Sequence, residues 1–139
     1  MDLTSDFPTE LGIVTCLMLL AATLWIPYIY GLSTDPAQPE GFTHPADQTQ
    51  LRPWVRRAFR AHLNLLEQGV PFAILVLILD RVGGFNTLTY WTAIAFFWLR
   101  IAHAAGMITG IARMPLRPII FCLGWLCCLI MGYAVFAAT

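Results

Sequence analysis

Four apolar stretches, each long enough to cross a lipid bilayer as a helix, constrain the fold of this chain more than any other feature. They cover about residues 11–32, 54–80, 87–108 and 119–137. The hydrocarbon core of a bilayer requires about 20 apolar residues in a helix, and only helices and closed barrels satisfy their backbone hydrogen bonds there. Charged residues make up only 12% of the chain, against about a quarter in a soluble domain. The sequence therefore predicts an all-α integral membrane protein, with residues 1–139 forming one domain built as a four-transmembrane-helix bundle.

The segments between these stretches predict how the helices connect. Pro27 interrupts the first span near one end, beside Trp25, and predicts a kink at an interfacial aromatic belt. Residues 33–51 lose the apolar pattern and hold three prolines, which predicts a polar connection without its own core. The pair Gly83-Gly84 leaves few residues between the second and third spans, so these two spans should form an antiparallel hairpin.

The arginines predict the orientation of the chain in the membrane. With four spans, both termini lie on the same side. One side holds Arg52, Arg56, Arg57 and Arg60 in the first connection and its helix start, and Arg113 and Arg117 in the last connection; the other side holds only Arg81. An excess of basic residues marks cytoplasmic loops. We therefore expect both basic connections in the cytoplasm and both termini outside. We also expect the membrane to be a bacterial inner membrane.

Polar and ionisable residues inside two of the spans indicate a functional site. At about 100° per residue, one stripe of the second span carries Arg57, Arg60, Asn64, Glu67 and Pro71, whereas His62 points away from it. In the third span, Arg100 and His103 lie one helical turn apart. Charged groups are costly in lipid, so they normally face protein or trapped water and are a functional-site hypothesis by default.

The depth of these residues predicts a contact between two helices. At about 1.5 Å per residue, Glu67 lies about 14 Å, and Arg100 about 12 Å, from the cytoplasmic ends of their helices. We therefore expect Glu67 and Arg100 to interact, directly or through Asn64, His103 or water. Two interpretations stay open: an ion pair that fixes helix register, and a polar pocket that opens towards the cytoplasm. The clustering of Asn64, His103 and the arginines in one half favours the pocket.

Other residue types restrict the classes of function. A formal net charge of zero gives no support for nucleic-acid binding. We interpret the cysteines as small buried hydrophobic residues, since none has metal-binding spacing: Cys16, Cys122, Cys127 and Cys128. His62 and His103 lack a third ligand at a convincing spacing, so no metal site is expected. Gly106 and Gly110 have the spacing of a small-residue ridge, which lets helices approach closely in lipid.

A resemblance to a known family rests on three segments of the chain. Arg57-x-x-Arg60-Ala61-His62-x-Asn64-x-x-Glu67, followed by Pro71-Phe72, closely resembles the second-helix signature of the MAPEG family, the membrane-associated proteins of eicosanoid and glutathione metabolism. The resemblance continues through Arg100-x-x-His103 and Arg113-x-Pro115-x-Arg117. It implies a homotrimer of four-helix subunits, with active sites between adjacent subunits near the cytoplasmic face. Similar members bind glutathione and convert its thiol to a thiolate that attacks, reduces or isomerises a lipophilic electrophile.

The resemblance also implies roles for individual residues. Arg117 would be the catalytic residue that stabilises the thiolate, because a nearby cation lowers the pKa of a thiol. Asn64 and Glu67 would bind the glutathione backbone, with Glu67 favouring its amino group, and Arg113 would bind a carboxylate. The remaining residues implied to bind glutathione are Arg60, His62, Arg100 and His103.

Two functions from different classes follow. The first is a glutathione-dependent transferase or peroxidase that acts on lipophilic electrophiles. The alternative is a non-catalytic trimeric membrane protein that binds lipid or a small amphiphile in the inherited pocket. This alternative stays open because Leu63 stands where many members carry an arginine, and Gly106, Met107 and Ile108 stand where some members carry a tyrosine. These departures leave fewer contacts for glutathione. A proton-coupled transporter, suggested by Glu67 and His103, ranks below both because transporters more often show repeats and broken helices.

Overall fold

The fold consists of helices, as the sequence predicts. The computed structural model describes residues 7–39 and 44–139, and this part of the chain contains no strand. The helices are α1 (Thr9–Thr23), α2 (Trp25–Ser33), α3 (Pro53–Arg81), α4 (Thr87–Thr109) and α5 (Leu116–Ala138). Four helical stretches are long and apolar enough to cross a membrane, with α1 and α2 together forming the first. Each begins and ends within three residues of its predicted span, and the predicted all-α, four-span fold class is confirmed.

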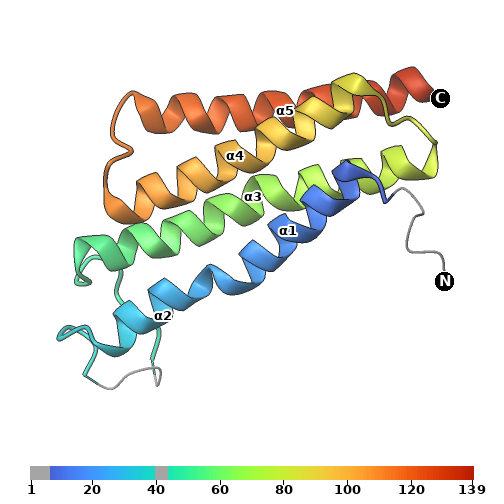
Figure 1. The fold of residues 1–139 in the computed structure, drawn as a ribbon. Helices are drawn as coiled ribbons and strands as arrows, with labels where there is room; N and C mark the ends of the chain where they lie inside the picture. Colours follow the sequence, from blue (N-terminus) through green and yellow to red (C-terminus); the bar gives the residue numbers. More distant parts are fainter. Residues whose placement is uncertain (1–6, 40–43) are drawn as a thin grey trace.

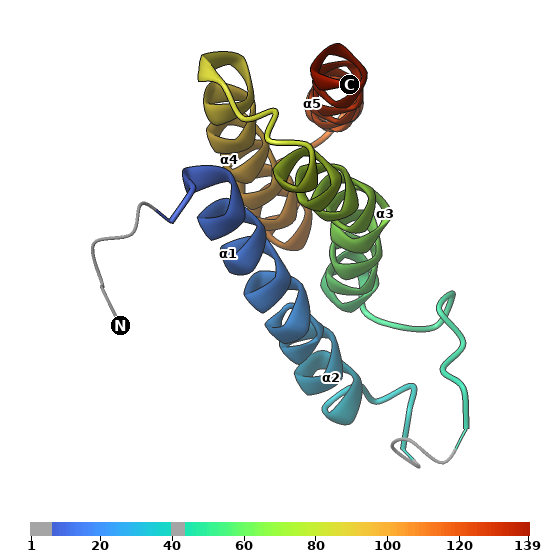
Figure 2. The ribbon, with the colours of Figure 1, turned by 90° about the vertical axis from the view of Figure 1, so that its right-hand side faces the viewer.

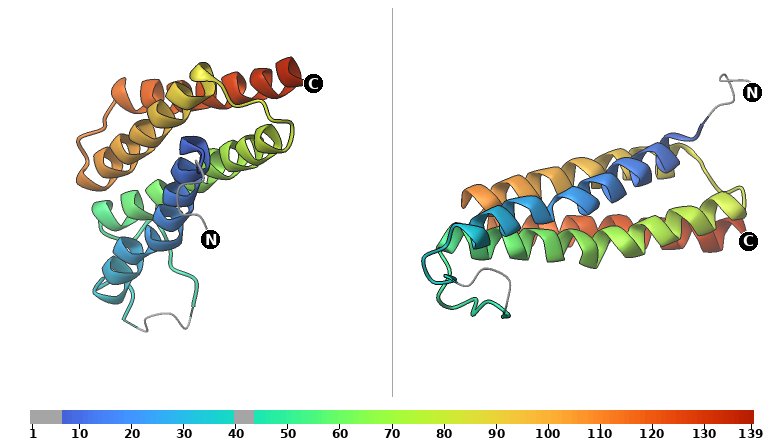
Figure 3. Two further views of the ribbon diagram at one scale, coloured as in Figure 1. Left: turned by 45° about the vertical axis from the view of Figure 1, so that its right-hand side comes forward. Right: turned by 90° about the horizontal axis from the view of Figure 1, so that it is seen from below.

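The first span is interrupted where the sequence predicts a kink. Pro27 has no backbone N–H and cannot donate to the carbonyl of Thr23, the residue four positions earlier. The break falls at Leu24, between α1 and α2. The indole Nε1 of Trp25 donates to the carbonyl of Ala22 at 2.7 Å, which bridges the break. Figures 1 and 3 show α1 and α2 following one another along the bundle.

The central pair of the bundle is α3 and α4, which run antiparallel as predicted (Figure 1). Helix α1 packs against both, and α5 packs against both, but α1 and α5 do not contact each other. Figure 2 shows α5 and the α1–α2 rod on different sides of this pair. At the centre of the core, the rings of Phe72 and Phe96 are stacked with centroids 3.9 Å apart. The two basic connections lie at one end, and the α3–α4 turn lies at the other (Figure 1).

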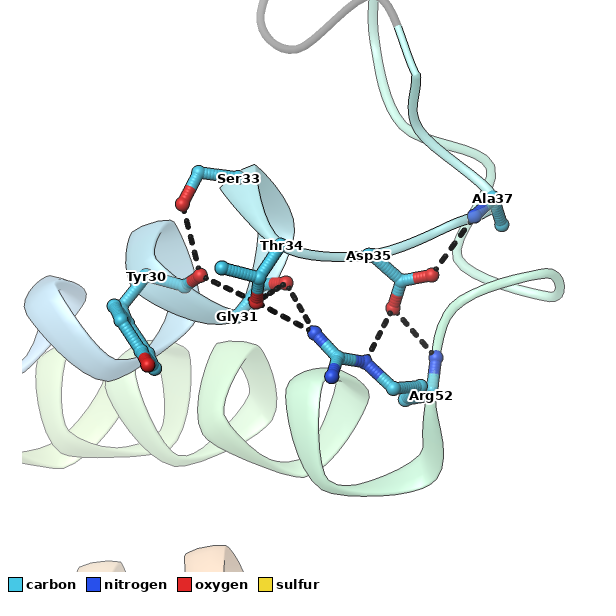
Figure 4. Close-up of polar contacts among 7 residues, drawn as sticks. All are labelled: Tyr30, Gly31, Ser33, Thr34, Asp35, Ala37 and Arg52. Carbon is cyan, nitrogen blue, oxygen red and sulfur yellow. Dashed lines mark hydrogen bonds and ion pairs between the residues drawn. The ribbon is translucent and has the colours of Figure 1, made fainter.

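Arg52 joins the end of α2 to the start of α3 (Figure 4). Its guanidinium Nη2 donates to the carbonyl of Gly31 at 2.9 Å and to the hydroxyl of Thr34 at 2.8 Å, and its Nε donates to the carboxylate of Asp35 at 3.2 Å. The backbone N–H of Arg52 also donates to that carboxylate, at 2.9 Å. This backbone hydrogen bond lowers the pKa of Asp35 from its usual 3.8, although desolvation opposes the shift. The connection is therefore fastened where it meets the helices.

A small hydrophobic cluster lies where this connection meets α2 and α3. Leu32 and Leu51 are buried, and together with Val55 they form a small cluster separate from the main core. The cluster is possible because the Arg52 contacts hold α2 close to the first turn of α3. Residues 40–43, within the same connection, lie outside the described residues.

Two glycines end helices with positive φ. Gly83, with φ of 67°, forms the turn after α3. Asn86 then starts α4 with a capping box, in which its side chain accepts from the backbone N–H of Thr89 and the Thr89 hydroxyl accepts from the backbone N–H of Asn86. Gly110, with φ of 80°, is the C-cap of α4. Gly110 therefore ends the helix, and the interpretation that it belongs to a small-residue ridge along that helix is wrong.

Candidate functional site

A pocket of about 390 Å³ lies between α3, α4 and the beginning of α5, in the half of the bundle that contains the basic connections. Three helices and the α4–α5 connection contribute side chains to it. Five lining residues were predicted as site residues: Arg60, Asn64, Glu67, His103 and Arg117. The others are Met114, Pro118, Phe121 and Cys122.

The wall from α3 follows the stripe expected from helical periodicity. Arg60, Asn64 and Glu67 are spaced four and three residues apart, so they lie on one face. Arg60 and Glu67 are exposed, whereas Asn64 is buried. The Asn64 side-chain Nδ2 donates to the carbonyl of Arg60 at 2.8 Å, which fixes the amide at the back of the wall. The stripe thus offers a cation, an amide and a carboxylate in one row.

Arg100 lies behind the pocket and does not line it. It is 1% exposed, and its Nη2 donates to the carbonyl of Ile120 in α5 at 3.0 Å. Gln68 lies beside it, with Nε2 donating to the carbonyl of Phe121 at 3.0 Å. The absence of a side chain at Gly124 makes room for both, because a Cβ there would come within 2.5 Å of Arg100 Nη2 and would also overlap Gln68 Oε1. The Arg100 side chain therefore fastens α4 to α5.

Of the predicted routes between Glu67 and Arg100, the direct contact and those through Asn64 or His103 are absent within the described part of the chain, and the route through water stays a prediction. The carboxylate of Glu67 forms no ion pair there, and neither Asn64 nor His103 bridges it to the guanidinium. Consecutive residues of a helix point about 100° apart. Gln68 therefore turns towards Arg100, whereas Glu67 turns outward into the pocket. The preferred interpretation, a polar pocket, describes the arrangement better than an ion pair that fixes register.

His103 gives the pocket a buried imidazole. The residue is 2% exposed and lines the pocket from α4. Its Nε2 has no hydrogen-bond partner among the described residues. Its ring centroid lies 6.3 Å from that of Phe121. A buried polar atom without a partner is costly, so His103 is suited to a polar ligand or water in the pocket.

The first turn of α5 places Arg117 at the pocket. Its backbone N–H donates to the carbonyl of Arg113 at 3.0 Å, and the next residue, Pro118, has no N–H. Few free backbone donors therefore remain at this helix start, and an anion in the pocket would be attracted mainly by the guanidinium groups of Arg60 and Arg117. Two other predicted residues lie outside the pocket: Arg113, exposed with its Nε donating to the carbonyl of Gly110, and the half-buried His62.

Some residues of this region were missed or misread from the sequence. Gln68 is polar and directly follows Glu67, so its position in the span was a usable signal. Phe121 and Met114 are apolar residues beside or within an apolar span, so the sequence contains no signal for them.

The interpretation of all four cysteines as buried is wrong for Cys122 and Cys16, which are exposed on their helices. No cluster of three potential metal ligands occurs among residues 7–39 and 44–139.

Comparison with known proteins identifies the family of this chain. No curated protein matches it. The model of the MAPEG family matches residues 12–137, nearly the whole chain, including every segment on which the resemblance rests. Members of this family are glutathione transferases and peroxidases or lipid-metabolising proteins. With four apolar helices and this match, the protein is an integral membrane protein that belongs to the MAPEG family.

Proposed function

We propose that this protein is a glutathione-dependent transferase or peroxidase that acts on lipophilic electrophiles, and that it works as a homotrimer. The observation that supports the proposal is the composition of the pocket, in which Arg60, Asn64, Glu67, His103 and Arg117 meet from three helices. Glutathione carries two carboxylates, one ammonium and a thiol. Guanidinium groups suit carboxylates, and a carboxylate suits an ammonium. The pocket therefore offers a partner for each kind of charge on glutathione.

Arg117 is proposed to generate the reactive form of the thiol. A fixed positive charge favours the thiolate over the thiol, and the thiolate is the nucleophile. The thiol proton passes to water. In a transferase reaction, the sulfur forms a bond to the electrophilic carbon and the leaving group departs with its electron pair. In a peroxidase reaction, the thiolate attacks the peroxide oxygen to give a sulfenic acid and an alcohol, and a second glutathione then yields the disulfide and water.

The lipophilic substrate is proposed to enter from the membrane along α5. Pro118 and Cys122 line both the polar pocket and an adjoining groove of about 450 Å³. This groove has apolar walls that include Trp125 and Leu126. A substrate dissolved in the bilayer would thus reach the thiolate without leaving an apolar surface.

The proposed orientation places the pocket where glutathione is found. The two basic connections lie at the same end of the bundle as Arg60 and Arg117 (Figure 1). Basic residues favour the cytoplasmic side. We therefore place the pocket mouth at the cytoplasmic face of a bacterial inner membrane, with both termini outside. In the proposed trimer, neighbouring subunits would supply the remaining wall of each pocket, and membrane lipid would surround the assembly.

The proposal is tested with purified protein, by titration calorimetry with glutathione and by turnover of a chloronitrobenzene and a lipid hydroperoxide. Removing one donor that stabilises a developing anion costs about a hundredfold or more in turnover. We expect that loss for Arg117→Ala, together with loss of the ultraviolet absorbance of bound thiolate. Arg81→Ala removes the same charge from an exposed position at the other end of α3 and should leave turnover unchanged. Absence of binding at millimolar glutathione would contradict the proposal.

One observation favours the alternative function, a non-catalytic protein that binds a lipid or an amphiphile. Within one subunit, Arg60 and Arg117 are the arginines that line the pocket, and Arg100 and Arg113 lie outside it. An amphiphile with a single anionic group needs no more cations than these. Mass spectrometry of lipids retained by the purified protein would distinguish the two functions. A tightly retained anionic lipid that glutathione does not displace would support the alternative.

A further inference from the structure

A second pocket lies at the other end of the bundle, beside the turn between α3 and α4. Its volume is about 430 Å³. The lining residues are Glu10, Phe85, Asn86, Thr87, Tyr90 and Trp91. They come from the first turn of α1, the α3–α4 turn and the first turn of α4, which lie together in Figures 1 and 2. None of them lines the first pocket, between α3, α4 and the beginning of α5.

Glu10 places a buried carboxyl group in this pocket. The residue is 4% exposed, and its Oε1 accepts a hydrogen bond from the Thr89 hydroxyl at 2.7 Å. No cationic side chain pairs with it among residues 7–39 and 44–139. A carboxylate can accept about four hydrogen bonds. The positive end of the α1 dipole favours a negative charge here, and the side-chain donor to this carboxyl group among the described residues is Thr89.

The Thr89 hydroxyl takes part both in the contact with Glu10 and in the capping box of α4. The hydroxyl oxygen accepts the backbone N–H of Asn86 at 2.9 Å, and a hydroxyl has one proton to donate. Two acceptors lie within reach of that proton, Glu10 Oε1 at 2.7 Å and the carbonyl of Asn86 at 2.8 Å. This arrangement holds the carboxylate at a fixed position on the pocket wall.

Aromatic rings line the same pocket. Phe85, Tyr90 and Trp91 line the pocket with Glu10, and the rings of Tyr90 and Trp91 meet edge to face with centroids 5.2 Å apart. Aromatic faces attract cations, most of all Trp, and cages of such rings recognise quaternary ammonium groups. Tyr and Trp are also common anchors at membrane interfaces. Anchoring explains the rings but does not explain a buried carboxylate among them.

We propose that this second pocket binds an alkylammonium cation, with Glu10 as its anionic partner and the rings of Phe85, Tyr90 and Trp91 as its cage. The pocket lies at the first turn of a helix that is long and apolar enough to span a membrane, and the ends of such helices meet lipid headgroups. A zwitterionic lipid with a choline or ethanolamine headgroup presents such a cation there. A free organic cation from the adjacent solution has the same chemistry.

The experiment measures which headgroup the full-length protein retains. The protein is placed in nanodiscs that contain phosphatidylcholine and phosphatidylglycerol with identical acyl chains, and the lipids that remain bound are identified by native mass spectrometry. We expect phosphatidylcholine to be favoured by about tenfold, the factor typical of a partly desolvated cation–aromatic contact. Glu10→Gln keeps an acceptor for Thr89 and should abolish this preference, and Trp91→Leu should reduce it severalfold. Asp80→Asn, an exposed charge change at the same end of the bundle, should have no effect.

Tetramethylammonium chloride separates the two sources of the cation. Its release of bound phosphatidylcholine supports a lipid headgroup as the occupant. Its binding to the wild-type protein but not to Glu10→Gln, without any lipid preference, supports a free organic cation. Equal retention of both lipids with no tetramethylammonium binding would overturn the proposal, as would equal effects of Glu10→Gln and Asp80→Asn. Because the pocket is separate from Arg117, glutathione turnover in Glu10→Gln should equal that of the wild type.

Discussion

The substitution Gly124→Ala is the sharpest test of how α5 is held in the bundle. A Cβ at position 124 would lie 2.5 Å from Nη2 and 2.9 Å from Cζ of Arg100, and would overlap Gln68 Oε1. Contacts under 3.0 Å require a neighbour to move. Both neighbours are buried, and both are hydrogen-bonded to α5 carbonyls at 3.0 Å. The methyl group therefore displaces the contacts that join α3 and α4 to α5.

The expected loss in the free energy of unfolding follows from two effects. Overfilling a packed core costs about 1–3 kcal/mol. Weakening the hydrogen bond from a buried guanidinium inside a membrane protein adds about 1 kcal/mol. We expect Gly124→Ala to lower the free energy of unfolding by about 2–4 kcal/mol. Gly132→Ala, eight residues later on α5, meets no atom within 4 Å and should be neutral or stabilising by up to about 1 kcal/mol, since alanine is favoured over glycine in helices.

Reversible unfolding in mixed micelles, followed by circular dichroism, measures both variants under the same conditions. A second comparison uses Gln68→Ala, which removes one of the atoms that the new methyl group meets. The double variant should lose less than the sum of the two single losses, because the sites are in contact. If Gly124→Ala and Gly132→Ala unfold alike, Arg100 and Gln68 do not pack over position 124 and the description of this helix contact is incorrect.

Two further predictions concern the α2–α3 connection. The backbone N–H of Arg52 lowers the pKa of Asp35 from 3.8, so the folded protein binds this proton less readily than the unfolded chain. The contribution of Asp35 to stability is therefore complete above pH 3.8 and is lost as the pH falls through the lower pKa of the folded state. Asp35→Asn should flatten the dependence of the melting temperature on pH in acid. An unchanged dependence would argue against the interaction. Gly31→Ala places a Cβ 2.7 Å from the ring of Trp54 and from the side chain of Val55; we expect a loss of about 1–3 kcal/mol in the free energy of unfolding, and a wild-type value would show that α2 does not pack closely on α3.

The spans and the kink could be predicted because their causes are local. An apolar run of about 20 residues has few alternatives in a bilayer, and the missing N–H of Pro27 interrupts a helix in any surroundings. The same reasoning placed Gly83 in a turn. It failed for Gly110, because the GxxxG spacing is the same whether the second glycine continues a ridge or ends the helix. Ala112 donates to the carbonyl of Gly106 at 2.9 Å, which closes the helix end instead.

The depth of the candidate site and the stripe of α3 that lines it could be predicted, but not which α3 side chain faces Arg100. Glu67 and Arg100 were correctly placed in the same half of the bundle, since rise per residue is nearly constant along a helix. Which side chain faces a neighbour depends on how each helix turns about its axis, and this is decided by packing. A rotation of α3 by about 100° about its axis would put the Glu67 side chain where that of Gln68 now points. A sequence argument from depth alone cannot separate these two neighbours.

The wall that α5 contributes was the least predictable part of the pocket, because most residues of this helix are apolar. Phe121 and Cys122 belong to an apolar span whose faces look alike in the sequence, so nothing distinguishes a pocket wall from a lipid-facing surface. Polar signals come only from Arg117, at the start of the helix. The structure supplies the missing distinction through Gly124, whose lack of a side chain admits Arg100 and Gln68. The position of the α5 wall therefore depends on a buried arginine contributed by α4, and Gly124→Ala is expected to alter the pocket as well as the stability of the fold.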